Sequence, residues 1–352
     1  MHRPPSFFDV ENQLVKIYQL NDFLPKLKSL IDWEMFRPDL NKVREKERLS
    51  NAGRKPFDVV LMFKILVLKS LYNLADDRIE EQIRDRLSFR DFLGLAFSDI
   101  VPDSKTIWFF AEQLKDLGLE RVLFDRFNEE LDRAGFQVKS GLIMDGSFVE
   151  VPRPRNTKEE NERLKNGESP DTVFTNPHVL AQKDVEAEWT KKGNETYCGY
   201  ENHGLIDEGY KFVRDYGVTG AAVHDSVPCL SVAPEKPAYP DQEFFGDSAY
   251  SSEEIDTKLK ERGFIPYICE KGYRNKPLTE EQKLFNRIKS SVRCRVEHVF
   301  GAMKVRCRDE ILRTIGLERA AFWIGLRNLT YNLGRFVSLL GSCHVRKPVK
   351  VR

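Results

Sequence analysis

The sequence contains little cysteine, and its cysteines follow no metal-binding pattern. There are 6 in 352 residues, and no two of them form a C-x-x-C pair. Structural zinc sites and disulfide frameworks are usually announced by such short cysteine spacings, so neither zinc binding nor disulfide bonding is expected. Reduced thiols in a cytoplasmic protein are the simplest interpretation.

Long apolar runs are also missing. Residues Met1 to Asp9 contain no apolar core of signal-peptide length. The longest apolar stretch, Phe57 to Ala75, is interrupted by Asp58, Lys64 and Lys69, which indicates a buried helix and not a membrane span. With 41% hydrophobic residues and a mean hydropathy of −0.49, the chain is predicted to be a globular, cytoplasmic protein with no membrane partner.

A strong net charge is absent, since the formal charge is +1. The local balance differs, because residues 287–313 hold eight Lys or Arg against three Asp or Glu, and residues 341–352 add four basic residues and no acid. Basic stripes on an otherwise neutral chain are an electrostatic footprint of nucleic-acid binding. Scattered surface lysines and arginines are the alternative interpretation.

The first part of the chain predicts a helical domain over residues 10–135. Apolar residues recur at helical spacing through a series of short segments. One helix is predicted to begin at Pro56, and another is capped near Asp103 and runs through Leu114. This last helix fits either the DNA reader of a helix-turn-helix or a member of a plain bundle.

After Gly135 the pattern changes to short apolar strands. We expect strands over residues 141–145, 244–247 and 264–269, a hairpin over 197–219 and a helix over 251–262. This is a mixed α/β sheet, so the fold class is α+β with an all-helical N-terminal domain. The predicted catalytic domain covers residues 136–340, with a loop insertion at about 153–195, and residues 341–352 form a basic tail.

The stretch from Asn286 to Lys304 predicts one amphipathic helix, because its apolar residues recur at helical spacing. Arg293, Glu297 and Lys304 would then share a face of that helix. One carboxylate between two cations is either a solvated salt-bridge ladder or a surface that binds phosphate and metal.

Three carboxylates are the candidate catalytic residues. Asp145 and Asp247 lie within or at the end of predicted buried strands, and Glu297 follows on the predicted helix. Carboxylates at strand ends converge in open α/β sheets, and a cluster of oxygen donors suits Mg²⁺ or Mn²⁺. Two such ions would support in-line phosphoryl transfer. A cap or turn role for either aspartate remains open from the residues alone.

The same residues carry a resemblance to a known family. The chain resembles the bacterial DDE transposases of the insertion sequence five family, within the insertion sequence four superfamily. The matching segments are Val101-Pro-Asp-Ser-Lys-Thr106, Asp145-Gly-Ser147, Trp189 to His203, Gly246-Asp-Ser-Ala-Tyr250, and Arg293-x₃-Glu297-x₆-Lys304. One departure is Ser290, because the superfamily pattern has a tyrosine three residues before the arginine.

The resemblance implies an RNase H-like catalytic domain and a transposase that cuts DNA at insertion-sequence ends and joins the ends to a target. It implies that Asp145, Asp247 and Glu297 bind two ions of Mg²⁺ or Mn²⁺. Lys304 would contact a phosphate, and Arg293 would position DNA near the cleaved end. The implied partners are terminal inverted repeats, target DNA and a second copy of the chain, in the bacterial nucleoid.

Other basic side chains and histidines remain open to two interpretations. Lys191 and Lys192, in a predicted turn, contact DNA phosphates or are ordinary surface lysines. His203 and His224 reach DNA or close a hairpin, and the second role is favoured. His298 is interpreted as a packing residue, or as one that supports the metal ligands from outside, and not as a metal ligand.

Two alternative functions also fit the sequence. One is a DNA-end-binding protein that has lost catalysis, although the presence of all three carboxylates argues against it. The other is a different two-metal nuclease or phosphatase on the same fold, although the helical domain and the basic segment favour a polymeric DNA substrate.

Overall fold

The computed structural model describes residues 8–20, 22–45, 55–192, 194–273, 277–306 and 311–344. The chain divides into two compact units. We call Met1–Glu129 with Leu326–Arg352 the helical unit, and Glu130–Gly325 the sheet unit. The helical unit thus includes residues after Leu326, which the sequence analysis assigned to the catalytic domain. None of the described helices is long and apolar enough to cross a membrane.

The first part of the chain is helical, as predicted. Its elements are α1 (Asp9–Leu20), α2 (Phe23–Leu30), η1 (Trp33–Phe36), α3 (Arg37–Leu40), η2 (Asn41–Arg44), α4 (Val59–Tyr72), α5 (Asp76–Asp85), α6 (Leu87–Leu93), α7 (Ser104–Asp116) and α8 (Leu119–Arg133). Most of α4 is buried, because it is apolar on nearly every side. The rings of Phe36 and Phe63 lie 4.9 Å apart, centroid to centroid, in the core beside it.

Two helix starts test the capping predictions. Asp103 caps α7, because its carboxylate accepts a hydrogen bond from Thr106 N at 2.7 Å. The predicted start at Pro56 is wrong. Asp58 accepts from the amides of Val60 and Leu61, both at 3.0 Å, so the helix begins at Val59.

The helix-turn-helix interpretation finds no support in the chain path. Residues 94–103 separate α6 from α7, whereas a helix-turn-helix joins its helices by a turn of about 3–4 residues. The alternative, a plain bundle, fits this part of the chain better, because α7 packs on α4 and α5.

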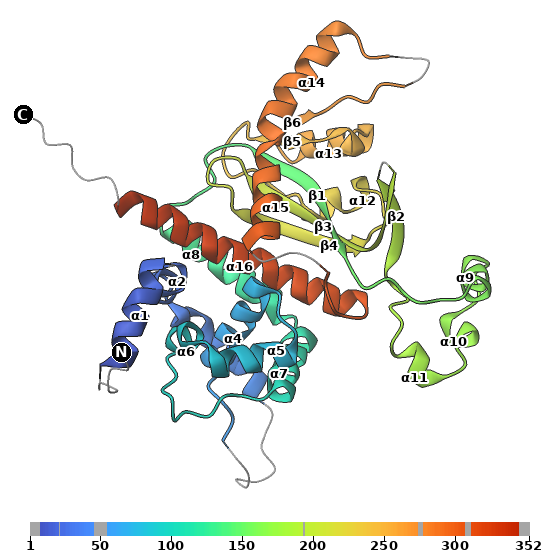
Figure 1. Cartoon of the computed structure of the whole chain (residues 1–352). Coiled ribbons are helices and arrows are strands. Elements are labelled where there is room, and N and C mark those ends of the chain that lie inside the picture. The colour runs from blue at the N-terminus through green and yellow to red at the C-terminus, as the bar shows by residue number, and fades with distance from the viewer. Residues whose placement is uncertain are drawn as a thin grey trace, which may run out of the picture. The chain divides into compact units, whose positions relative to one another are not determined.

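A six-stranded sheet forms the centre of the sheet unit (Figure 1). Its strands are β1 (Leu142–Glu150), β2 (Glu188–Lys192), β3 (Glu195–Asp207), β4 (Val213–Gly220), β5 (Glu243–Gly246) and β6 (Ile265–Ile268). The order is β2-β3-β1-β5-β6, and β4 also pairs with β3. Strands β1, β3 and β4 are antiparallel, whereas β5 and β6 run parallel to β1. This is an RNase H-like arrangement.

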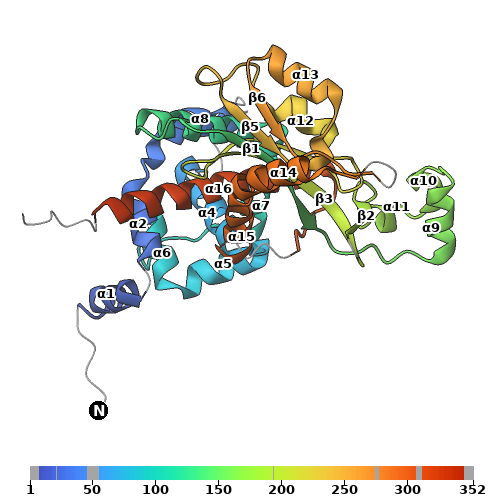
Figure 2. The same ribbon diagram turned by 90° about the horizontal axis from the view of Figure 1, so that it is seen from above.

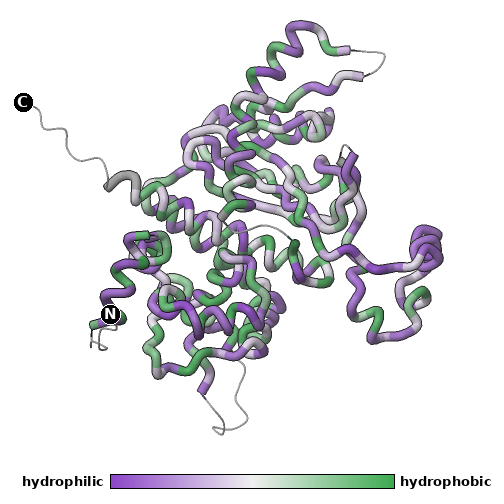
Figure 3. The backbone as a smooth tube through the Cα atoms, in the orientation of Figure 1, coloured by the Kyte–Doolittle hydropathy of each residue, from purple (hydrophilic) through white to green (hydrophobic). Residues whose placement is uncertain are grey.

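Helices also surround the sheet and fill the insertion. They are α9 (Lys158–Lys165), α10 (Pro170–Val173), α11 (Pro177–Leu180), α12 (Ser226–Val232), η3 (Ser248–Tyr250), α13 (Glu253–Glu261), α14 (Glu280–Arg293) and α15 (Arg295–Arg306). The last helix, α16 (Leu317–His344), begins in the sheet unit and continues in the helical unit. The predicted loop insertion therefore holds three short helices and β2. Of these, α9 is hydrophilic along its length (Figure 3).

The predicted single helix from Asn286 to Lys304 is wrong, because two helices meet at Cys294. The amide of Glu297 donates to the carbonyl of Cys294 at 3.2 Å, a three-residue step that tightens the chain there. In Figure 2, α14 and α15 run in different directions. Arg293 ends the first helix, whereas Glu297 and Lys304 belong to the second.

The two faces of the sheet are covered by different helices. Successive side chains of a strand alternate between faces. Asp145 and its register partner Gly204 lie on one side, which we call the Asp145 face. The partners Gly146 and His203 lie on the other, the His203 face. In Figure 2, α15 lies on one side of the sheet, and α12 and α13 lie on the other.

Candidate active site

Asp145 lies in the middle of β1, on the central strand of the sheet. Its side chain is 18% exposed, so it is reachable without being fully solvated. The Arg293 guanidinium at the end of α14 donates from Nη1 to Asp145 Oδ2 at 2.9 Å. The arginine that was expected to share a face with Glu297 therefore pairs with the first aspartate.

Asp247 follows directly after the last residue of β5. In the parallel pair of β1 and β5, Leu142 is level with Phe244 and Ile143 with Phe245. Asp145 and Asp247 each come two residues after the Ile143–Phe245 pair, so the same register continued past the end of β5 would bring them level. Hydrogen-bonded strands lie about 4.8 Å apart. Asp247 Oδ1 also accepts from Ala249 N at 2.8 Å, which fixes the orientation of this carboxylate.

Tyr250 lies within electrostatic range of both aspartates. Its side chain is fully buried, and burial raises the pKa of the phenol well above its usual range. The carboxylates of Asp225, Asp145 and Asp247 raise this pKa further, so all three lie close enough to act on the ring electrostatically.

Glu297 approaches the same face from α15. It is in the first turn of this helix and is exposed. The helix packs on β1, and one turn further on Phe300 lies over the sheet. A Cβ atom placed on Gly204 would be 3.4 Å from the Phe300 ring, and Gly204 is the register partner of Asp145. The lack of a side chain at Gly204 therefore lets α15, which carries Glu297, pack closely on the Asp145 face.

The three predicted ligands do not form one tight cluster. Within the part of the chain that the structure describes, the group of potential metal ligands whose donor atoms all lie within 4.8 Å of one another is Glu201, His203 and Asp225. Asp145, Asp247 and Glu297 are not in that group. A pair of divalent ions about 3.5–4 Å apart needs a broader set of carboxylates than a single ion does.

Comparison with known families decides the assignment. Residues 136–333 match the family described as "Transposase DDE domain", and residues 12–113 match "Transposase domain (DUF772)". The chain belongs to the DDE transposase family. Enzymes of this family cut DNA and transfer its strands, and they generally use divalent metal ions. The fold also resembles a cryo-EM structure of a piggyBac transposase synaptic complex with hairpin DNA, with a TM-score of 0.47 and 11% identity over 90% of this chain and 76% of that one.

The predicted DNA-contacting side chains of the transposase lie on several elements. Lys304 is exposed on α15. Within the described residues, no ion pair joins Glu297 to Arg293 or Lys304, so the salt-bridge ladder is not present there. Lys191 and Lys192 belong to β2 and not to a turn, because they pair with Thr196 and Glu195 of β3. Lys191 is exposed, whereas the side chain of Lys192 lies outside the described part.

The histidines of the transposase have different environments. His203 is completely buried, and burial lowers its pKa to about 4, so the imidazole is neutral at ordinary pH. Nδ1 of His224 forms a hydrogen bond of 2.8 Å with Ser226 Oγ, at the start of α12. His298 was expected to pack, but it is exposed, because it lies on the outer side of α15.

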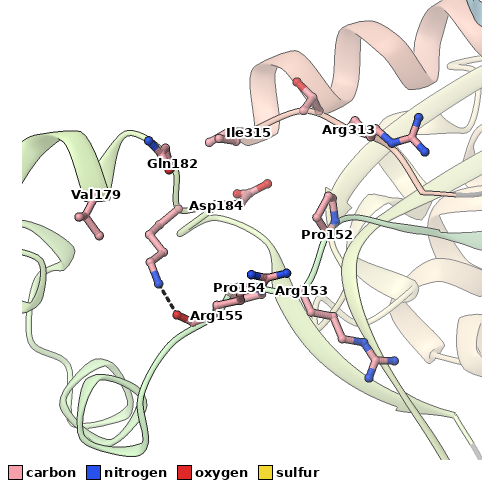
Figure 4. A pocket seen from close by; sticks show the side chains of 11 residues that line it. Pro152, Arg153, Pro154, Arg155, Val179, Gln182, Asp184, Arg313 and Ile315 are labelled. Atoms are coloured by element: carbon pink, nitrogen blue, oxygen red, sulfur yellow. Dashed lines mark hydrogen bonds between the residues drawn. The ribbon is translucent and has the colours of Figure 1, made fainter. Parts of the chain in front are cut away.

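A basic pocket was not anticipated from the sequence. It has a volume of about 540 Å³ and lies between the start of the insertion and the segment before α16. Figure 4 shows Arg153, Arg155 and Arg313 around it, with Asp184 also among its lining residues. Lys183 Nζ donates to the carbonyl of Arg155 at 2.6 Å and ties the two ends of the insertion together. Arg313 is far from Arg153 and Arg155 in sequence, so no local pattern indicated that the three would line one pocket.

Proposed function

We propose that this transposase belongs to the insertion sequence five family and uses Asp145, Asp247 and Glu297 to cut the ends of its element and join them to target DNA. The observation that supports this proposal is the β1–β5 register, whose continuation by two residues would bring Asp145 and Asp247 level. It is also supported by the position of α15 on the Asp145 face. All three residues offer hard oxygen donors, which suit Mg²⁺ or Mn²⁺.

The chain's own groups have distinct parts in this reaction. The three carboxylates would hold two divalent ions, which supply a polarised attacking oxygen and stabilise the leaving oxygen. Asp145 and Asp247 hold their positions through the sheet, and the Ala249 amide orients Asp247. Glu297 would close the site from the helix side.

Arg293 has a specific part in this proposal. Its guanidinium contacts Asp145 Oδ2, the oxygen that a cation on the Asp145 face would also bind. An ion on Asp145 would therefore compete with the guanidinium and turn it toward a phosphate of the cleaved end. A planar fork that donates two hydrogen bonds suits that phosphate. Lys304, exposed two turns beyond Glu297 on α15, would contact a neighbouring phosphate.

Further DNA contacts are proposed away from the carboxylates. Lys191 and Lys192 on β2, and the three arginines around the basic pocket, offer donors for backbone phosphates. The helical domain of residues 10–135 would supply recognition of the inverted repeats. We further propose that two copies of the chain act together on paired ends.

The test is a cleavage assay on a plasmid that carries the DNA flanking this gene. We expect nicking at the element ends in Mg²⁺ or Mn²⁺, no nicking in EDTA or Ca²⁺, and joined products when target DNA is added. A plasmid of the same length with scrambled ends is the matched control. Equal cutting of both plasmids would refute the proposed end-specific function and leave a general nuclease.

A further inference from the structure

A second cluster of potential ligands lies on the His203 face, on the opposite side of the sheet from Asp145. Glu201 and His203 are two residues apart on β3, so both side chains point to this face. Asp225 immediately precedes α12, which packs on β3 and β4. A ring nitrogen of His203 and one carboxylate oxygen from each of Glu201 and Asp225 all lie within 4.8 Å of one another.

The hydrogen bonds of His203 define which ring nitrogen carries the proton. Its Nε2 lies 2.8 Å from Thr219 Oγ1, on the neighbouring strand β4. The Thr219 hydroxyl donates its only proton to the carbonyl of Gly220 at 3.0 Å. The threonine oxygen must therefore accept from Nε2–H, which leaves the lone pair of a neutral imidazole on Nδ1.

This lone pair has nothing to accept from within the described chain. His203 is 0% exposed, and its Nδ1 has no hydrogen-bond partner among the described residues. A buried polar atom without a partner has a cost of about 1–3 kcal/mol, so such atoms usually have a ligand or an ordered water. Nδ1 is thus an unused donor atom for a cation, on a side chain that is already held in position.

The chemistry of the whole group suits a divalent cation. The Nδ1 lone pair of His203 and the two carboxylates, once ionised, are three electron-pair donors. A divalent cation accepts a lone pair from each of them and attracts both negative charges. The Nε2–H···Thr219 bond is also the outer contact that a metal-binding histidine usually makes.

We propose that Glu201, His203 and Asp225 bind one divalent transition-metal ion, Zn²⁺ in preference to Mn²⁺. One nitrogen and two oxygen donors, with water as a fourth ligand, match tetrahedral zinc. An imidazole ligand disfavours Mg²⁺ and Ca²⁺, and zinc binds such sites more tightly than manganese. The cysteine spacing of the chain disfavours a zinc site built from cysteines, and this site contains no cysteine.

The ion would act as a brace between three elements of the sheet unit. Glu201 and His203 hold it to β3, Thr219 links His203 to β4, and Asp225 connects it to the start of α12. It would be separate from the ions proposed at Asp145, Asp247 and Glu297, because the two groups lie on opposite faces. The proposal therefore stands or falls independently of the proposed function.

The experiment uses the full-length chain and two pairs of shape-conserving substitutions. The background variant, Asp145→Asn with Asp247→Asn, weakens the catalytic face. The test variant adds Glu201→Gln and Asp225→Asn, which keep the side-chain shapes but remove both charges. Each protein is stripped with a chelator, loaded with Zn²⁺, Mn²⁺ or Mg²⁺, and dialysed. Bound metal is measured by elemental analysis, and folding by circular dichroism.

We expect the background variant to retain about one Zn²⁺ per chain and to gain thermal stability from it, and the test variant to retain none. Cobalt loading gives a second readout, because Co²⁺ in a tetrahedral nitrogen–oxygen site absorbs visible light and shows no thiolate band. Retention of zinc by the folded test variant would overturn the proposal. Failure of the background variant to bind zinc would also overturn the proposal, because an ordered water would then be the partner of His203 Nδ1. Stronger retention of Mn²⁺ than of Zn²⁺ would contradict the preferred ion.

Discussion

The two faces of one sheet carry different chemistry, although adjacent residues of the same strands form them. On the Asp145 face, the carboxylate of Asp145 is partly exposed, and the helix above it presents exposed Glu297 and Lys304. On the His203 face, Glu201 and His203 are buried at 5% and 0% exposure. The comparison shows how the alternation of side chains along a strand separates two kinds of surface. A substrate can reach the Asp145 face, whereas the largely buried cluster of Glu201, His203 and Asp225 can only stabilise the fold.

The largest expected effect is that of a substitution on the Asp145 face. Asp145→Asn should lower DNA cleavage by more than about 100-fold, because the lost carboxylate would act in the transition state. The melting temperature should change little, because the amide fills the same volume. Plasmid nicking and thermal unfolding are the measurements, with Asp171→Asn on the exposed helix α10 as control. Cleavage at the rate of the unmodified protein would contradict the proposed role of Asp145.

Two glycines offer a matched comparison of the faces. A Cβ on Gly204 would be 3.4 Å from Phe300 of α15, and one on Gly217 would be 2.9 Å from Val232 of α12. Gly204→Val and Gly217→Ala should each cost about 1–3 kcal/mol of unfolding free energy by overpacking; valine is needed at 204 because the Cβ of alanine would make only an ordinary contact with Phe300. Gly204→Val should also reduce cleavage by roughly tenfold to a hundredfold, because its methyl groups would displace α15.

Gly217→Ala should instead weaken zinc retention and affect cleavage less, because it displaces α12 and Asp225. The two variants are compared by denaturant unfolding, metal analysis and plasmid nicking. Equal loss of cleavage in both variants would mean that the two faces are not functionally separate.

A smaller effect is expected from the exposed lysine of the Asp145 face. Lys304→Ala should weaken binding to a cleaved DNA end and reduce the dependence of log K on log salt by about one unit. The melting temperature should stay the same, because Lys304 has no ion pair among the described residues. Lys283→Ala, which removes an exposed pair with Glu280 on α14, is the control. An unchanged salt slope measured by fluorescence anisotropy would exclude a phosphate contact.

The smallest effect should come from Tyr250, whose pKa is raised by carboxylates of both faces. Its hydroxyl is buried and has no hydrogen-bond partner among the described residues. Tyr250→Phe should therefore alter the unfolding free energy by less than about 1 kcal/mol and leave cleavage nearly intact. Chemical denaturation and plasmid nicking test this expectation. A tenfold or greater loss of cleavage would show that the hydroxyl couples the faces.

Sequence patterns predicted the helical and mixed α/β parts, because apolar periodicity reports which side of an element is buried. They also identified the strands of Asp145 and Asp247. The break at Cys294 was missed, since no proline or glycine marks it and the apolar spacing continues through both helices. The consequence was that Arg293 was predicted to lie beside Glu297, whereas the structure pairs it with Asp145.

The cluster of Glu201, His203 and Asp225 could not be predicted from local sequence patterns either. Glu201 and His203 alternate on a predicted strand, which is a detectable signal, but such pairs are common in buried sheets. Asp225 is brought to them only by the chain path between β4 and α12. Nδ1 of His203 is left as an acceptor because Nε2 is bonded to Thr219 on the neighbouring strand. A contact between two strands cannot be predicted from one segment of the sequence.

The attachment of α14 has a further consequence for how the protein responds to heat. This helix has no buried residue, and Phe285 and Ile288 are 57% and 56% exposed. It is fastened to the end of β6 by polar contacts, with Asn286 bonded to both backbone groups of Glu270 and Lys289 donating to the carbonyl of Ile268 at 2.8 Å.

Because little apolar surface would be uncovered when α14 detaches, the heat-capacity change of that opening should be small. Its amide hydrogens should therefore exchange with solvent through local opening, well before those of the buried strands. The Arg293–Asp145 pair sits at the junction of this loosely held helix and the firmly packed sheet.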